Sequence, residues 1–97
     1  MFIAKRHAAR GRSLLAVIDS ELAGKIFTEG KLQLDLSSEF YNGKEMSEKQ
    51  FKEEAIHYEA LNLVGKRIVK IAKGMGLINH IVTVADIPHA EAVILKD

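Results

Sequence analysis

The feature that most constrains the fold is the stretch Leu61–Ile78, which reads LNLVGKRIVKIAKGMGLI. It carries four basic residues and no acidic one. Apolar residues recur in it at the i, i+3, i+4 spacing of an amphipathic helix, and these are Leu61, Val64, Ile68, Ile71, Ala72 and Met75. The bases fall on the opposite side. We therefore predict a helix that buries one face and presents positive charge on the other.

The composition is typical of one globular domain. The chain has 97 residues, of which 47% are hydrophobic and 28% charged, and we assign residues 1–97 to a single domain. The absence of cysteine excludes disulfides, thiol catalysis and thiolate metal ligands. The longest uncharged run, 74–85, is too short to span a membrane, and no signal peptide is visible. We expect a cytoplasmic protein with no membrane partner.

Charge alternates along the chain, although the net charge is only +1. Residues 1–12 and 61–80 each carry four bases and no acid, whereas residues 13–60 carry ten acids and five bases. If the two basic segments lie side by side, they form a patch that suits a polyanion such as RNA. Alternatively, the first segment protects an exposed strand edge. The candidate binding bases are Lys5, Arg6, Arg10, Arg12, Lys66, Arg67, Lys70 and Lys73.

The first half of the chain predicts two strands, a short helix and a third strand. Phe2–Ala8 and Ser13–Ile18 form an opening hairpin around a turn at residues 10–12. Asp19 or Ser20 caps a short helix over Glu21–Lys25, after which Ile26 and Phe27 serve as apolar anchors. The strand Lys31–Leu36 alternates, and we expect its three leucines to point inward, namely Leu32, Leu34 and Leu36.

The second half predicts two helices and a closing hairpin. Ser47 and Gln50 have the spacing of a capping box, and Met46 and Phe51 that of a hydrophobic staple. The strands Ile81–Ala85 and Ala92–Leu95 follow the central helix. Pro88 cannot donate a ladder hydrogen bond, so we place it in the turn between those strands.

These elements predict an α+β fold with the order β-β-α-β-α-α-β-β. We expect a mixed or antiparallel sheet of four to five strands, with the two longer helices packed on one face. Since strands and helices do not alternate strictly, a doubly wound sheet is disfavoured.

No strong catalytic motif is present. The glycines build neither a phosphate-binding loop nor a dinucleotide fingerprint, and the histidines lack metal-ligand spacing, so we predict no metal and no cofactor. No motif for sequence-specific DNA binding is found. His89 follows Pro88 in a stiff segment and is the single catalytic candidate, with a backbone-bonded turn histidine as the alternative. Tyr41 and its neighbour Phe40 form a stacking platform or, alternatively, a plug on the core.

Four short motifs occur in a characteristic order. They are Asp19–Gly30 (DSELAGKIFTEG), Phe40–Gly43 (FYNG), Asn62–Gly65 (NLVG) and Ile87–Ala90 (IPHA). Through them the chain resembles, over nearly its whole length, the archaeal "domain of unknown function 424" family. The resemblance implies an archaeal cytoplasmic protein, and it implies no reaction and no catalytic residues.

Three functions are compatible with the sequence. The first is a non-enzymatic binding module for RNA or a ribonucleoprotein, which uses the bases above together with Tyr41 and His89. The second is a small-molecule enzyme with its active site at Ile87-Pro88-His89, helped by Asp86 or Glu91. The third is a protein-interaction subunit or homodimer. The segregated positive charge favours the first.

Overall fold

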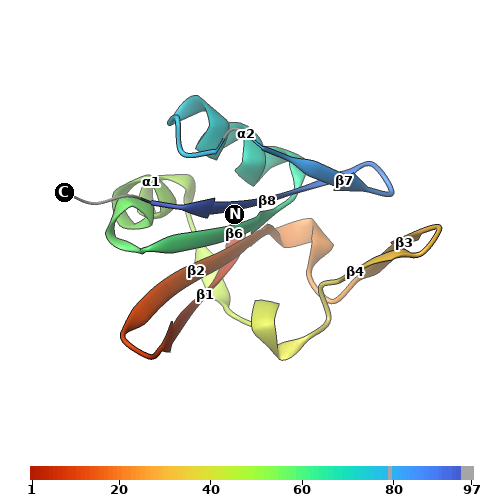
Figure 1. The fold of residues 1–97 in the computed structure, drawn as a ribbon, viewed down its shortest axis with the longest axis horizontal. Helices are drawn as coiled ribbons and strands as arrows, with labels where there is room; N and C mark the ends of the chain where they lie inside the picture. Colours follow the sequence, from red (N-terminus) through yellow and green to blue (C-terminus); the bar gives the residue numbers. More distant parts are fainter. Residues whose placement is uncertain (79, 95–97) are drawn as a thin grey trace.

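A computed structural model describes residues 1–78 and 80–94 (Figure 1). The two α-helices are α1 (Glu48–Glu54) and α2 (Lys66–Gly74), and three single 3-10 turns are η1 (Ser20–Leu22), η2 (Glu39–Tyr41) and η3 (Ala55–His57). The strands are β1 (Phe2–Ala9), β2 (Arg12–Asp19), β3 (Ile26–Glu29), β4 (Leu32–Asp35), β5 (Lys44–Met46), β6 (Ala60–Val64), β7 (Val82–Val84) and β8 (Ile87–Val93).

The fold is α+β, as predicted, but its main sheet has more strands than expected. Over the described residues the main sheet has six strands in the order β5-β1-β2-β6-β8-β7, and not four or five. The hairpin β3-β4 forms a separate sheet that projects from the body as an arm (Figure 1). The predicted order missed three strands: β3 and β5, which have only four and three residues, and β6, whose residues were assigned to a helix.

One parallel pair organises the sheet. All neighbouring strands run antiparallel except β2 and β6, in which Leu15 lies opposite Leu61 and Val17 opposite Leu63. A parallel pair needs a long crossover connection. Here the crossover contains the arm, β5 and α1, and it returns the chain to the start of β6.

Both helices pack on one face of the sheet, as expected. Successive strand residues point to opposite faces, so Leu15 and Val17 of β2 enter the core beneath the helices while Ile18 faces the other way. From α1, η3 and α2 this core receives Phe51, Ala55, Ile68, Val69 and Ala72. On the opposite face, a smaller core joins Ile18 to residues of the arm and of β6 and β7, namely Leu34, Leu36, Val64 and Val84.

The helix predicted over Leu61–Ile78 was wrong in its first part. Residues Ala60–Val64 form strand β6, and the helix runs only over Lys66–Gly74. Gly65 separates them with a φ of 123°, a conformation that side-chain-bearing residues rarely adopt. A short buried apolar run fits a strand as well as a helix, and periodicity alone does not distinguish them. From Lys66 onward the prediction is confirmed in part, since the four bases are exposed and Ile68 and Ala72 are buried, while Ile71 and Met75 are half-buried.

A side chain from another strand caps the first turn of α2. Asp19, the last residue of β2, is only 3% exposed. Its carboxylate accepts hydrogen bonds from the backbone N–H groups of Arg67 (3.0 Å) and Ile68 (2.9 Å). The predicted helix Glu21–Lys25 is wrong, because this segment is only the single turn η1, which has no side-chain cap. Asp19 thus caps a helix, but one 48 residues away in sequence.

Two of the predicted inward-facing residues lie on the surface. Leu32 is 51% exposed and Ile26 is 53% exposed, whereas Leu34 and Leu36 are buried as expected. Leu32 sits near the tip of the β3-β4 arm, beyond the sheet against which Leu34 packs (Figure 1). The alternation of apolar and polar residues therefore predicted this strand correctly. It did not predict that the strand extends beyond the main sheet, where Leu32 is exposed.

The closing hairpin exists, but its turn is tighter than predicted. The turn residues are Ala85 and Asp86, both at positive φ (49° and 66°), so Pro88 lies in strand β8 and not in the turn. In a two-residue hairpin the pair next to the loop exchanges hydrogen bonds and the following pair does not. Pro88 belongs to that second pair, opposite Thr83, and its missing N–H breaks no bond to β7. Leu95, the predicted end of the last strand, lies outside the described residues.

The start of α1 is confirmed in detail. Ser47 Oγ accepts from the Gln50 N–H (3.1 Å), and Gln50 Oε1 accepts from the Ser47 N–H (2.8 Å). Met46 and Phe51 are both buried in the helix-side core, as the staple requires. Neither helix found in the described part of the chain has the length and apolar character needed to cross a membrane.

Candidate functional site

The N-terminal bases lie in three different surroundings. Strand alternation sends Lys5 and Arg6 to opposite faces of the sheet. The Lys5 Nζ donates to the backbone carbonyl of Glu39 (2.6 Å), whereas Arg6 is paired with Glu54 of α1 at 2.6 Å. The hydrogen bond from Arg6 to Glu54 raises the pKa of the Arg6 side chain. Arg6 is therefore engaged in joining β1 to α1.

Arg10 and Arg12 lie at the tip of the β1-β2 hairpin. Arg10 adopts a φ of 54° and Gly11 a φ of 76° in the turn. Both arginines are exposed, and within residues 1–78 and 80–94 no acidic side chain lies in ion-pair contact with them. The tip lies apart from α2 in Figure 1, so the predicted bases do not gather in one patch.

Helix α2 presents the longest row of bases. Lys66, Lys70 and Lys73 are exposed, lie one turn apart on one side, and have no ion pair among the described residues. We call these three lysines the basic face of α2. The helix itself, KRIVKIAKG, contains no acidic residue to offset them. The face is thus a concentrated and uncompensated positive charge.

Arg67 is held differently from its neighbours. It forms a two-pronged hydrogen-bonded ion pair with Glu21, with Nε to Oε2 at 3.1 Å, and donates to the backbone carbonyl of Met1 (3.0 Å). Its guanidinium lies over the Phe2 ring, 4.8 Å from the centroid. The hydrogen bonds from Arg67 lower the pKa of the Glu21 carboxyl to about 2. Arg67 therefore fastens the N-terminus to α2, and its charge is largely neutralised.

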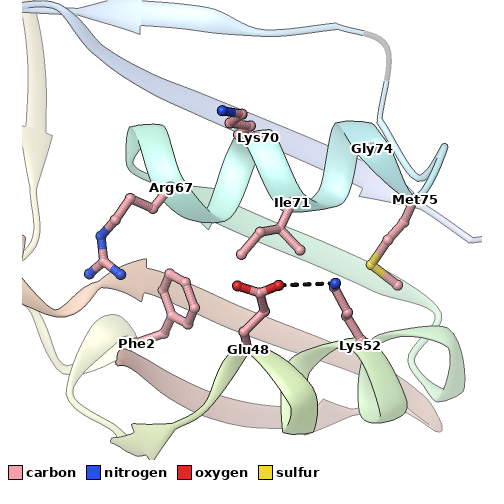
Figure 2. A pocket seen from close by; sticks show the side chains of 8 residues that line it. All are labelled: Phe2, Glu48, Lys52, Arg67, Lys70, Ile71, Gly74 and Met75. Atoms are coloured by element: carbon pink, nitrogen blue, oxygen red, sulfur yellow. Dashed lines mark ion pairs between the residues drawn. The ribbon is translucent and has the colours of Figure 1, made fainter.

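A groove of about 550 Å³ runs between the two helices (Figure 2). Ile71 and Met75 point from α2 toward α1, and Glu48 and Lys52 point from α1 toward α2. The last two form an ion pair at 3.0 Å. Phe2, Arg67, Lys70 and Gly74 complete the lining of what we call the α1-α2 groove. It combines an apolar floor with a charged rim that joins the basic face of α2 at Lys70.

A polar cluster lies on the opposite face of the sheet. Asn62 Oδ1 accepts a hydrogen bond from the Tyr41 hydroxyl (2.9 Å) and lies 3.1 Å from His89 Nε2. If Oδ1 accepts from both, His89 carries its proton on Nε2 and keeps an acceptor at Nδ1. Glu91 Oε1 lies 3.9 Å from His89 Nε2. We call the first three residues the Tyr41-Asn62-His89 cluster.

Burial shifts both titratable groups of this cluster. It lowers the pKa of the His89 imidazole, although the nearby Glu91 carboxylate acts against that shift. It raises the pKa of the Tyr41 phenol, and Glu91 adds to that effect. Both side chains are therefore neutral near pH 7, and the cluster can donate, accept or transfer a proton.

Two features of the site were not predicted. Asn62 was assigned to the predicted helix Leu61–Ile78, but it lies in strand β6 between Leu61 and Leu63. Because side chains alternate along a strand, the Asn62 side chain points to the face opposite that of the two leucines. The ring of Phe40 stacks on His7 with centroids 4.3 Å apart, and Phe40 meets Tyr41 edge to face. Both aromatic residues thus pack on the sheet near the cluster.

The sheet edges bear on the homodimer hypothesis. In the described part of the chain the main sheet ends at β5 and β7, each of three residues. These short strands cover only Phe2–Ala4 of β1 and Ile87–His89 of β8. The rest of β1 and β8 therefore has no strand of the described chain on its outer side, and such an edge can pair with a second chain.

Together these elements define a small α+β domain built on a six-stranded mixed sheet with two helices on one face. The chain belongs to the family described as "Protein of unknown function (DUF424)", whose model matches residues 7–95. This confirms the family resemblance of the sequence. Three of the four motifs that carried the resemblance meet in the cluster, because Tyr41, Asn62 and His89 each come from a different one.

A solved structure has a similar fold. It is the crystal structure of an uncharacterized conserved protein from Methanopyrus kandleri, with a TM-score of 0.79 and 25% sequence identity. The similarity covers 99% of this chain and 93% of that one. No curated protein matches the sequence.

Proposed function

We propose that this protein is a non-enzymatic RNA-binding module that contacts RNA phosphates through the basic face of α2. The observation that carries the proposal is the row of three exposed lysines, Lys66, Lys70 and Lys73, on a helix without acidic residues. Lysine ammonium groups neutralise phosphates and release condensed counterions. Such contacts give affinity that depends on salt and not on sequence.

The ion pairs elsewhere support the choice of this surface. Arg6 and Arg67 are already paired with Glu54 and Glu21. A base engaged in this way gains less from a phosphate, because the existing pair must be broken or shared. The three lysines have no such competitor among the described residues, so phosphate contact there costs little beyond ordering the side chains.

The experiment compares two charge-matched triple variants by fluorescence anisotropy with a labelled single-stranded RNA at low salt. K66A/K70A/K73A removes the basic face of α2, and K25A/K31A/K49A removes three exposed lysines elsewhere. We expect the first to weaken binding by about tenfold or more and the second by about threefold or less. Equal losses would show that only the net charge matters, and would contradict the proposal.

The Tyr41-Asn62-His89 cluster favours a second candidate function, a small-molecule enzyme that uses His89 as acid or base. The supporting observation is a half-buried imidazole held by Asn62, beside a carboxylate at 3.9 Å. A cavity of about 360 Å³ is lined in part by Asn62 and Glu91. His89 does not itself line this cavity, and it is connected to the lining through its contacts with Asn62 and Glu91.

NMR spectroscopy tests this second candidate. Nucleosides, sugar phosphates and small carboxylic acids are added singly to 15N-labelled protein at millimolar concentration. Saturable shifts at the amides of Asn62, His89 and Glu91, lost in His89→Gln, would support a ligand site. If no compound moves these resonances, the cluster is a structural hydrogen-bond network.

A further inference from the structure

We infer that the α1-α2 groove accepts one unpaired base, so that the basic face of α2 selects single-stranded RNA over duplex RNA. This inference rests on the proposed function and names the class of RNA that the same surface binds. It is carried by the position of an apolar hollow next to a row of lysines. A phosphate-binding surface alone needs no such hollow.

The floor of the groove suits the face of a planar ring. Ile71 and Met75 lie one helical turn apart, and both are half-buried, so part of each side chain faces the groove. Thioether sulfur and aliphatic groups make favourable contacts with aromatic rings. Gly74 adds no side chain to this wall, and a Cβ built there meets nothing within 4 Å. The space beside Met75 is therefore open to a ligand.

The charged residues at the rim of the groove leave the groove open. Lys70 belongs both to the groove lining and to the basic face of α2. In Figure 2 the Lys70 side chain points away from α1, so a phosphate bound to it would lie beside the rim of the groove and not inside it. On the opposite wall Glu48 would repel a phosphate, but its carboxylate is paired with Lys52 at 3.0 Å. At the end of the groove Arg67 is fixed over Phe2, which keeps that end rigid.

Geometry then separates single strands from duplexes. In a duplex the bases are paired and stacked inside, and only phosphates and sugars reach a helix surface, whereas unpaired bases can be splayed out onto a protein. A purely electrostatic surface favours the duplex, because its charge density is higher. A preference for single strands is therefore diagnostic of contact with a base.

The experiment measures the affinity of the full chain for a single-stranded RNA and for a duplex with the same number of phosphates, at one salt concentration. We expect the single strand to bind about tenfold more tightly, the increment that one stacked base gives. Gly74→Gln places a neutral side chain in the groove at a helical position. It should lower single-strand affinity about tenfold and leave duplex affinity unchanged, while Thr83→Gln, on β7, should change neither.

Each outcome has a distinct meaning. If wild type binds the duplex as tightly as the single strand, or if Gly74→Gln does not reduce the single-strand preference, the groove takes no base and this inference is wrong. Salt-dependent binding of both RNAs would still support the proposed function in that case. If neither RNA binds at low salt, the proposed function itself fails. Circular dichroism of Gly74→Gln distinguishes a blocked groove from a damaged fold.

Discussion

Asp19 occupies the space that a side chain at Gly65 would need. A Cβ built on Gly65 would lie 2.4 Å from Asp19 Cγ, and Gly65 itself has a φ of 123°. The same Asp19 carboxylate accepts from the first N–H groups of α2. The junction between β6 and α2 therefore depends on a glycine and a buried carboxylate that fit each other.

Gly65→Ala should destabilise the protein by about 3 kcal/mol or more. The strained φ costs about 1–3 kcal/mol, and the new methyl group also displaces the cap of α2. Urea unfolding followed by circular dichroism measures the change. Gly74→Ala is the matched control, because its Cβ meets nothing and alanine favours a helix by about 0.5–1 kcal/mol. Similar losses in both variants would contradict this account of the junction.

Asp19→Asn should cost about 1–3 kcal/mol. The side chain keeps its size, but an amide has one acceptor oxygen, so one of the N–H groups of Arg67 and Ile68 loses its partner while the NH₂ group faces it. The helix N-terminus also loses a favourable negative charge. Glu53→Gln, an exposed change on α1, should stay within about 0.5 kcal/mol. Thermal unfolding of both variants would decide, and an unchanged Asp19→Asn protein would show that the cap contributes little.

Tyr41→Phe should destabilise the wild-type protein by about 1 kcal/mol, because it removes the hydroxyl that donates to Asn62 Oδ1. In an Asn62→Ala background the same change should cost less than about 0.5 kcal/mol, since the acceptor is gone. A double-mutant cycle in urea measures this difference. Additive losses would mean that the 2.9 Å contact carries no coupling energy.

The stability should fall more steeply with acid in wild type than in His89→Gln. Burial lowers the pKa of His89 in the folded protein, so the unfolded chain, with a pKa of about 6.5, binds the proton more tightly. The stability that His89 contributes is fully present above the pKa that it has in the unfolded chain. It is lost as the pH falls through that value toward the lower pKa of the folded protein. Unfolding at about pH 7.5 and about pH 5 tests the slope. Equal slopes for both proteins would contradict the shift.

The sequence correctly predicted those elements that depend on residues close together in the chain. Ser47 and Gln50 form their capping box because both partners lie within one turn. The opening hairpin follows from two apolar runs around Gly11. The assignment failed at Leu61–Val64, where a buried strand and a buried helix leave the same apolar pattern. The capping of α2 by Asp19 could not be predicted either, because it joins residues that are 48 positions apart in the sequence.

The individual residues of the candidate site could be predicted from the sequence, but their positions relative to one another could not. The bases of α2 are exposed as expected, but the fold separates them from Arg10 and Arg12 and pairs Arg6 and Arg67 with acids. Tyr41 and His89 were chosen for unrelated reasons, and they meet only through Asn62. Such convergence depends on the register between β6 and β8, which no single stretch of the sequence contains.

The central claim is that Lys66, Lys70 and Lys73 contact RNA phosphates. The most direct measurement is the dependence of the RNA affinity on salt. A plot of log affinity against log salt for single-stranded RNA should have a slope of about −2 in wild type, as three released counterions require, and a slope near zero in K66A/K70A/K73A. A slope that the triple variant leaves unchanged would contradict the claim.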